Sequence, residues 1–310
     1  MLLIDQISND KEKTLKGLKK RGFKNLGVVN EIIELNNIRK KTQQELDQIL
    51  FESNTISKEI AEIFKSGNKS DNVENLKNKS ADLKSRSKDL SDKLDKTKSD
   101  ILSLITTIPN LPDDNVPDGF TVNDNVEVFS TGEIKDIPDN LKNHWDLAKD
   151  LDIIDFDLGS KITGSGFPVY KGKGAKLQRA LINFFLDRNT SAGYTEFQVP
   201  HLVNSQSAFA TGQLPDKDGQ MYHVINDDFY LIPTAEVPLT NIYRDTKVSI
   251  EKLPILLTGY TPCFRREAGS YGSDVRGLNR LHQFDKVEIV RLEHPDNSSK
   301  ALTGMKEHLK

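Results

Sequence analysis

The stretch Pro262–Val290 reads PCFRREAGSYGSDVRGLNRLHQFDKVEIV, and its pattern decides the fold. It starts and ends with residues typical of β-strands, and a long polar loop rich in glycine and serine joins the two ends. In the closing segment, Phe284, Lys286 and Glu288 alternate with the residues between them, as expected for a strand with two different faces. We therefore predict two strands connected by a long loop.

Arginines lie near the ends of both predicted strands, with Arg265 at the first and Arg280 at the second. A planar guanidinium group pairs bidentately with phosphate oxygens, so this spacing suits a bound polyphosphate. Glu267 and Glu288 add carboxylates that could hold an ammonium group, a ribose or a metal-bound water. For Arg265 the alternative interpretation is a surface ion pair with a nearby carboxylate.

Three other segments strengthen this interpretation: GFPVY at 166–170, TGQLP at 211–215 and TAEVP at 234–238. Taken together, the motifs resemble those of the seryl-tRNA synthetase family of bacterial type. The Phe-Arg-x-Glu motif, followed by a loop, an arginine and a phenylalanine, resembles the second signature of class II aminoacyl-tRNA synthetases. Thr-Ala-Glu resembles the serine-binding motif of that family, and the likeness extends from residue 1 to about Val290.

The resemblance implies a serine–tRNA ligase. Serine and ATP would form seryl-adenylate, and the seryl group would pass to the 3′ end of tRNA(Ser), with tRNA(Sec) as a further acceptor. Mg²⁺ would enter with ATP, held mainly by phosphates. The implied catalytic residue is Arg265. The implied ATP-binding residues are Arg265, Arg266, Glu267, Arg280, Leu281 and Phe284.

Within that set, Arg265 would contact the α-phosphate and Arg280 the γ-phosphate. Glu267 would lie near the adenine amino group, and Phe284 would stack on adenine. The implied serine-binding residues are Thr234, Ala235, Glu236, Arg265 and Glu288. Glu236 has an alternative interpretation as an acidic residue at a helix start.

The first third of the chain has the heptad spacing of a coiled coil. Ile49, Ile56 and Ile63 recur every seven residues, and so do Leu76 and Leu83, followed by further members of the same series at 90, 97 and 104. Turn-forming residues at 66–72 separate the two series. We predict an antiparallel hairpin over 1–108, with arms of roughly 30 residues, or roughly 45 Å, each.

The second predicted arm presents a basic face. Its candidate tRNA-binding residues are Lys77, Lys79, Lys84, Arg86, Lys88 and Lys93. A solvated coiled-coil surface also explains such charges. The resemblance implies instead that this arm contacts the tRNA backbone.

Residues 109–143 form a linker rich in proline and aspartate, and 144–310 form the predicted catalytic domain. Residues 172–189 have the spacing of an amphipathic helix, and 193–200 that of a strand ending at Pro200. The resemblance assigns this helix and strand to the first class II signature, which implies a homodimer interface at Pro200. The fold class is therefore α+β: a two-helix coiled-coil arm, then a mostly antiparallel sheet flanked by helices.

Bulk properties restrict the function classes. The 310 residues carry a net charge of −3, so a nucleic-acid site must come from a local patch. The single Cys263 excludes an intramolecular disulfide and is expected to be a small buried residue. We see no signal peptide, no membrane-spanning run and no zinc motif, and we expect a cytoplasmic protein.

Residues after Val290 do not resemble the third class II signature, so we expect a catalytic domain that is incomplete at its C-terminal end. Residues 291–310 are predicted to form a turn and a helix capped at Asp296, Asn297 or Ser298. Two alternatives to a ligase remain open. One is a non-catalytic tRNA-binding relative, and the other is a coiled-coil interaction protein with an attached nucleotide-binding domain.

Overall fold

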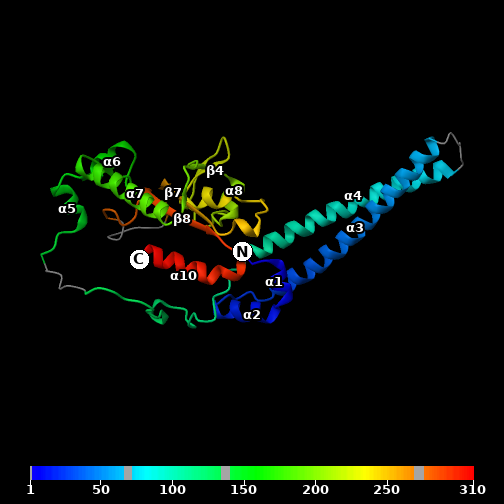
Figure 1. Cartoon of the computed structure of the whole chain (residues 1–310), viewed down its shortest axis with the longest axis horizontal. Helices are drawn as coiled ribbons and strands as arrows, with labels where there is room; N and C mark the ends of the chain where they lie inside the picture. The colour runs from blue at the N-terminus through cyan, green and yellow to red at the C-terminus, as the bar shows by residue number, and fades with distance from the viewer. Residues whose placement is uncertain (1, 66–71, 134–139, 269–275) are drawn as a thin grey trace. The chain divides into compact units, whose positions relative to one another are not determined.

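The computed structural model describes residues 2–65, 72–133, 140–268 and 276–310. The chain divides into two compact units, Met1–Ile134 and Lys135–Lys310 (Figure 1). The division falls inside the segment 109–143 that the sequence marks as a linker. The expectations for the inter-arm turn and for most of the glycine-rich loop lie outside the described residues.

The first unit is built on two long helices, α3 (Val28–Lys65, 38 residues) and α4 (Asn72–Ile105, 34 residues). Both are somewhat longer than the predicted arms. Ile49 and Ile56 of α3 pack in one buried cluster with Leu83 of α4. The heptad positions therefore form the seam between the helices, which confirms the predicted coiled-coil arm.

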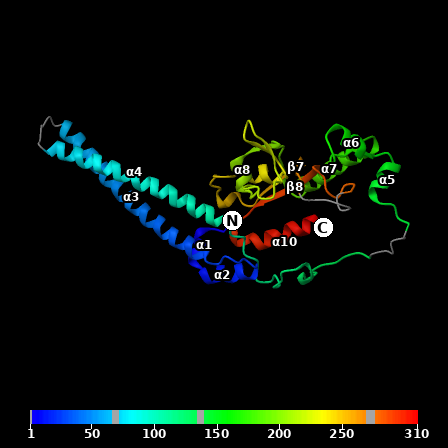
Figure 2. The same ribbon diagram turned by 180° about the vertical axis from the view of Figure 1, so that it is seen from behind.

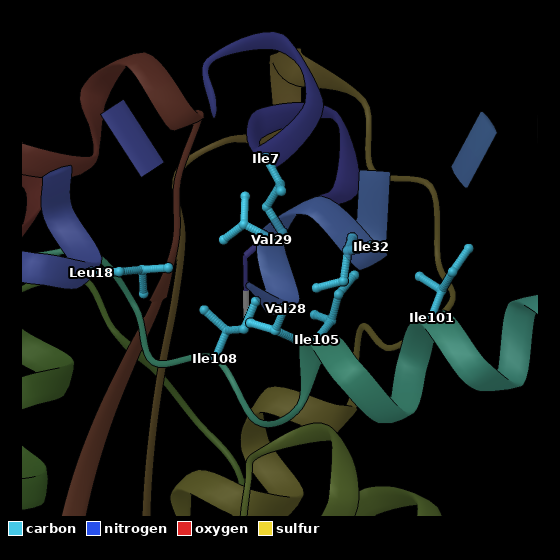
Figure 3. Packing of buried hydrophobic residues seen from close by; sticks show 8 residues of the cluster. All are labelled: Ile7, Leu18, Val28, Val29, Ile32, Ile101, Ile105 and Ile108. Atoms are coloured by element: carbon cyan, nitrogen blue, oxygen red, sulfur yellow. The ribbon is translucent and has the colours of Figure 1, made fainter. Parts of the chain in front are cut away.

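The base of the arm has a core that the heptads do not reveal. Two short helices, α1 (Ile4–Asn9) and α2 (Lys11–Lys20), pack there, and Figure 3 shows their apolar side chains meeting those of α3 and α4. The buried members of this cluster are Ile7, Leu18, Val28, Val29, Ile32, Ile101, Ile105 and Ile108. Asn36 is also buried and donates a hydrogen bond to the Ser8 hydroxyl (3.2 Å), so α1 is tied to α3 by a polar contact as well.

The second unit is organised around the sheet β3-β7-β8. Strands β7 (Ile255–Phe264) and β8 (Gln283–Leu292) pair antiparallel over ten residues, which confirms the two strands predicted from 262–290. Strand β3 has only two residues (Thr195–Glu196) and pairs parallel with β7, so the predicted strand at 193–200 is much shorter than expected. Helix α7 (Lys173–Ser191) packs against β7 and β8, as the two views in Figures 1 and 2 show.

Smaller elements surround this sheet. Strands β4 (Leu202–Asn204), β6 (Phe229–Leu231) and β5 (Tyr222–Val224) form a second antiparallel sheet in that order. Strands β1 (Ile154–Asp155) and β2 (Val169–Tyr170) form a short antiparallel pair. The remaining helices of the unit are α5 (His144–Asp150), α6 (Phe156–Ile162), α8 (Ser205–Ala210), α9 (Glu236–Asn241) and α10 (Ser298–Leu309). The N-cap of α10 is Asn297, one of the three residues predicted for that position.

Helix α7 exists where predicted, but its apolar face is not buried in this chain. Leu177, Leu181, Phe184 and Phe185 are 57%, 46%, 55% and 49% exposed. The side of α7 that faces the sheet instead carries Gly174, Gln178, Ile182, Leu186 and Asn189, which are buried or half-buried. The apolar stripe of α7 is therefore exposed in this chain.

A chain of three hydrogen bonds, one of them buried and two partly buried, links α10 to the sheet. The Asn189 amide nitrogen donates to the Thr258 hydroxyl (2.8 Å), which donates to the backbone carbonyl of Glu288 (2.8 Å). The Asn189 carbonyl oxygen thus faces Nε2 of His308 (2.8 Å), which must act as the donor. Tyr194 stacks on the His308 ring, with centroids 5.4 Å apart. Side chains from α10, α7 and β7 thereby form one series of hydrogen bonds, which ends at a backbone carbonyl of β8.

None of the helices in the described ranges is long and apolar enough to cross a membrane.

Candidate active site

The β7–β8 hairpin fixes the backbone on either side of the long loop. Just beyond β7, the Arg265 amide donates to the carbonyl of His282 (2.9 Å), and the Arg266 amide donates to the carbonyl of Gln220 (2.9 Å). Glu267 follows with a φ of 46°, a left-handed conformation that is uncommon outside glycine. Backbone hydrogen bonds therefore fix Arg265 and Arg266, and the turn at Glu267 changes the direction of the chain.

One end of the site is a hydrogen-bonded group of three side chains. The Thr234 hydroxyl donates to Oε2 of Glu288 (2.7 Å) and accepts from Nζ of Lys286 (3.0 Å). Lys286 also pairs directly with Oε2 of Glu288 (2.8 Å). The backbone amide of Glu236 donates to the same hydroxyl (3.2 Å), which fixes the start of α9 beside this group. Glu236 is therefore both the first residue of a helix and a residue of the site, so its two interpretations are compatible.

The other end of the site carries two arginines. The Arg265 guanidinium lies over the Phe284 ring, 5.2 Å from its centroid, as in a cation–π contact. Nη1 of Arg280 lies 2.8 Å from Oε2 of Glu267. Both cations thus stay within the site through contacts with residues of the same hairpin.

A cavity of about 390 Å³ lies between the two ends. Its walls are formed by Gln213, Gln220, Met221, Pro233, Thr234, Glu236, Arg265, Glu267, Ala268, Arg280 and Lys286. Three cations and two carboxylates border it, in a space large enough for a small polar ligand. Such a lining can hold a ligand that carries both phosphate and ammonium groups.

Five of the ten residues predicted to bind ATP or serine line this cavity, and the other five do not. Arg266 is not in its lining, because its guanidinium lies over the Tyr222 ring, 5.6 Å from the centroid. Ala235 and Leu281 are buried and support the site from behind. Phe284 borders a second cavity, of about 380 Å³, next to Asp285.

Asp285 lies in a polar network at that second cavity. It accepts hydrogen bonds from the Tyr260 hydroxyl (2.6 Å) and from the Gln178 amide. Burial raises the pKa of Tyr260, and the hydrogen bond to the Asp285 carboxylate raises it further. The phenol therefore remains the proton donor in its hydrogen bond to Asp285.

Lys286, Gln213 and Gln220 line the cavity, although the sequence motifs do not select them. For Lys286 a signal was present, because it lies two residues from both Phe284 and Glu288 and therefore on the same face of the strand. Both glutamines lie outside the strand hairpin; Gln213 belongs to the TGQLP segment at 211–215, whereas Gln220 belongs to none of the quoted motifs. Among the described residues, no group of three or more histidine, cysteine, aspartate or glutamate side chains could hold a metal ion.

Cys263 is fully buried, as expected, and faces Phe284 in the pairing of β7 with β8. Burial raises the pKa of its thiol. Pro200, by contrast, is exposed.

The basic residues of α4 are all exposed. The six predicted tRNA contacts are Lys77, Lys79, Lys84, Arg86, Lys88 and Lys93. Lys77 lies over the ring of Phe64 (5.5 Å to the centroid), and Arg86 is 3.9 Å from Asp82 of its own helix. Weak contacts of this kind at exposed positions leave the cationic groups accessible to a polyanion.

Comparison with known families identifies both units. The seryl-tRNA synthetase N-terminal domain family matches residues 1–112, and the tRNA synthetase class II core domain family (G, H, P, S and T) matches 222–310. A serine–tRNA ligase of Salinibacter ruber is 43% identical over 307 residues, covering 99% of this chain and 72% of that protein. One of Thermodesulfovibrio yellowstonii is 41% identical over 305 residues, covering 98% and 72%.

Solved structures of serine–tRNA ligases also resemble this chain. The seryl-tRNA synthetase of Pyrococcus horikoshii, complexed with ATP, superposes with a TM-score of 0.83 at 30% identity, covering 99% of this chain and 73% of that one. A cytoplasmic serine–tRNA ligase of Naegleria fowleri in complex with AMP shares the fold, with a TM-score of 0.79 at 24% identity, over 99% of this chain and 71% of that one. The hairpin thus lies within a class II aminoacyl-tRNA synthetase core domain. Within that class, the chain belongs to the serine–tRNA ligase family.

Proposed function

We propose that this chain activates serine with ATP and transfers the seryl group to tRNA(Ser), with tRNA(Sec) as a further acceptor. The observation that carries the proposal is the cavity between the Thr234–Lys286–Glu288 group and the two arginines. One end offers carboxylates and a hydroxyl, which suit the ammonium and hydroxyl of serine. The other end offers guanidinium groups, which suit phosphates.

In the first step, a serine carboxylate oxygen bonds to the α-phosphorus of ATP while the bond from that phosphorus to the bridging oxygen breaks. Pyrophosphate leaves with the electron pair, and seryl-adenylate remains. Catalysis of such a displacement is mainly positioning and neutralisation of charge. Arg265 is the residue to which we assign the α-phosphate, and Arg280 the γ-phosphate.

When ATP binds, its adenosine would replace some of the contacts that these side chains now make with one another. Glu267 accepts from Arg280 and would accept from the adenine amino group when Arg280 moves to phosphate. Phe284 would stack on adenine, with Arg265 beside the same ring. ATP would bring Mg²⁺ as its counter-ion, held mainly by phosphates, and we assign no protein ligand to the ion.

In the second step, a hydroxyl of the 3′-terminal adenosine of the tRNA attacks the acyl carbon, and AMP leaves. The exposed basic residues of α4 would bind the phosphate backbone of the tRNA. Residues 1–108 would then act as the tRNA-binding arm, 109–143 as the linker and 144–310 as the catalytic domain.

We also propose a homodimer that acts in the cytoplasm. The apolar stripe of α7, about half exposed in the single chain, would be covered by a second copy, with Pro200 nearby in the first class II signature. Light scattering coupled to size exclusion tests this idea. A monomer at all protein concentrations would refute it.

Serine-dependent exchange between ATP and pyrophosphate, measured on the purified protein, tests the activity. Threonine and alanine serve as controls. We expect exchange with serine alone, because a site that hydrogen-bonds the substrate hydroxyl disfavours alanine. Exchange that is absent, or equal for the three amino acids, would refute the proposal.

A further inference from the structure

The cavity does not open directly on Glu288. Thr234 and Lys286 line its wall, whereas Glu288 is not among the lining residues. The Lys286 ammonium lies 2.8 Å from Oε2 of Glu288 and 3.0 Å from the Thr234 hydroxyl. A cation of the chain itself therefore occupies the contacts with Glu288 and Thr234.

This ion pair differs from an ordinary surface pair. The side chains of Lys286 and Glu288 are 35% and 19% exposed, so the pair is partly withdrawn from water. Removing one partner of such a pair leaves the other charge desolvated and uncompensated. A ligand that separates Lys286 from Glu288 must therefore provide a new partner for each of them.

Serine is a zwitterion that meets this requirement. Its ammonium and carboxylate groups are carried on one carbon atom, close enough to contact both members of a separated pair. An anionic ligand alone would leave Glu288 unpaired, and a cationic one would leave Lys286 unpaired. A ligand that carries both charges would therefore leave neither residue unpaired.

We propose that serine binds by inserting into the Lys286–Glu288 ion pair. Its ammonium group replaces Lys286 on Glu288, and the displaced Lys286 ammonium takes the α-carboxylate. This inference rests on the proposed function and adds Lys286 to the residues that hold the amino acid. Because the α-carboxylate is the nucleophile of the activation step, Lys286 orients the attacking group.

Equilibrium dialysis with radiolabelled ligands tests the insertion without requiring catalysis. The ligands are L-serine and protonated L-serinamide, which keeps the ammonium and hydroxyl groups but lacks the carboxylate. The proteins are the unmodified protein and its Lys286→Met, Lys286→Arg and Lys171→Met variants. Lys171 is the matched control, because it is 38% exposed and pairs with Asp152 (2.5 Å) and Asp155 (3.3 Å), outside the lining of the cavity.

We expect Lys286→Met to weaken serine binding about tenfold or more, the size of one charged hydrogen bond. Serinamide binding should be unchanged or tighter, since Lys286 no longer competes for Glu288. Lys286→Arg should restore part of the serine affinity, and Lys171→Met should leave the ratio of the two affinities unchanged.

Equal weakening of both ligands by Lys286→Met would show a structural role only and would overturn the inference. So would unchanged serine affinity, or a change of the ratio in Lys171→Met. If the unmodified protein exchanges pyrophosphate with serine while either of the first two results holds, the proposed function stands and only the insertion fails. Absence of both serine binding and exchange would refute the two together.

Discussion

Replacing Asn189 by leucine should destabilise the second unit through the hydrogen bonds that meet at this residue. The substitution keeps the number and branching of the side-chain heavy atoms but removes an acceptor from His308 and a donor to Thr258. Each bond contributes about 1 kcal/mol, and a buried group left without its partner costs about 1–3 kcal/mol. We therefore expect the free energy of unfolding to fall by about 2–4 kcal/mol.

Urea unfolding can measure this effect in one unit at a time. Trp145 is the single tryptophan and belongs to α5 of the second unit, so its fluorescence reports on that unit. Far-UV circular dichroism, dominated by α3 and α4, follows the arm as an internal control. Only the fluorescence transition should move to lower urea.

A double-mutant cycle tests the reasoning itself. Thr258→Val removes the shared hydrogen bond from the other side, so the double variant should lose about 1–2 kcal/mol less than the sum of the single losses. Additive losses would mean that the two residues act independently. A loss below about 0.5 kcal/mol for Asn189→Leu would show that the bonds contribute nothing net.

Four other outcomes are expected. Leu83→Ala should lower the stability of the arm by about 2–3 kcal/mol, seen by circular dichroism, and leave the tryptophan transition in place; a shift of both would mean that the units unfold together. Arg265→Ala should reduce pyrophosphate exchange by about a hundredfold or more, and near-normal exchange would contradict its assignment to the α-phosphate. Reversing Lys84 and Lys88 to glutamate should weaken tRNA binding and its salt dependence while serine activation is kept; unchanged binding would remove α4 from the interface. Cys263 should react with a thiol reagent only after unfolding, because burial raises the pKa of its thiol. Its contribution to stability is full below the unfolded pKa near 8.5 and declines as the pH rises towards the folded pKa, which a urea series from about pH 7 to 10 can check.

Much of the fold could be predicted because local patterns coincide with the tertiary contacts. Ile49 and Ile56 in the first arm, and Leu83 in the second, belong to series with seven-residue spacing. This spacing specifies a seam between two helices, and the three residues are buried together. The alternation in 283–292 specifies a strand, and Thr234 does meet Glu288 across 54 positions of sequence. In the second case the residues were selected by resemblance, since nothing local relates one to the other.

The remaining features depend on contacts that no local pattern records. Helices α1 and α2 are short, and their burial depends on the base of α3 and α4. The amphipathic spacing of α7 predicts a helix correctly but does not say whether Phe184 faces the sheet or the solvent. The same limit applies to Lys286 in the site. The strand pattern predicts the face on which Lys286 lies, but it does not predict the ion pair with Glu288.

The distribution of buried side chains along the arm has a mechanical consequence. Eight buried apolar residues pack at its base, but no side chain is buried between Ser57 and Lys65 of α3 or between Val73 and Asp82 of α4. Local opening is easiest where few apolar contacts must be broken. Amide hydrogen exchange should therefore quicken progressively from base to tip. The tip of the arm could therefore deform against an uneven surface while the packed base keeps its structure.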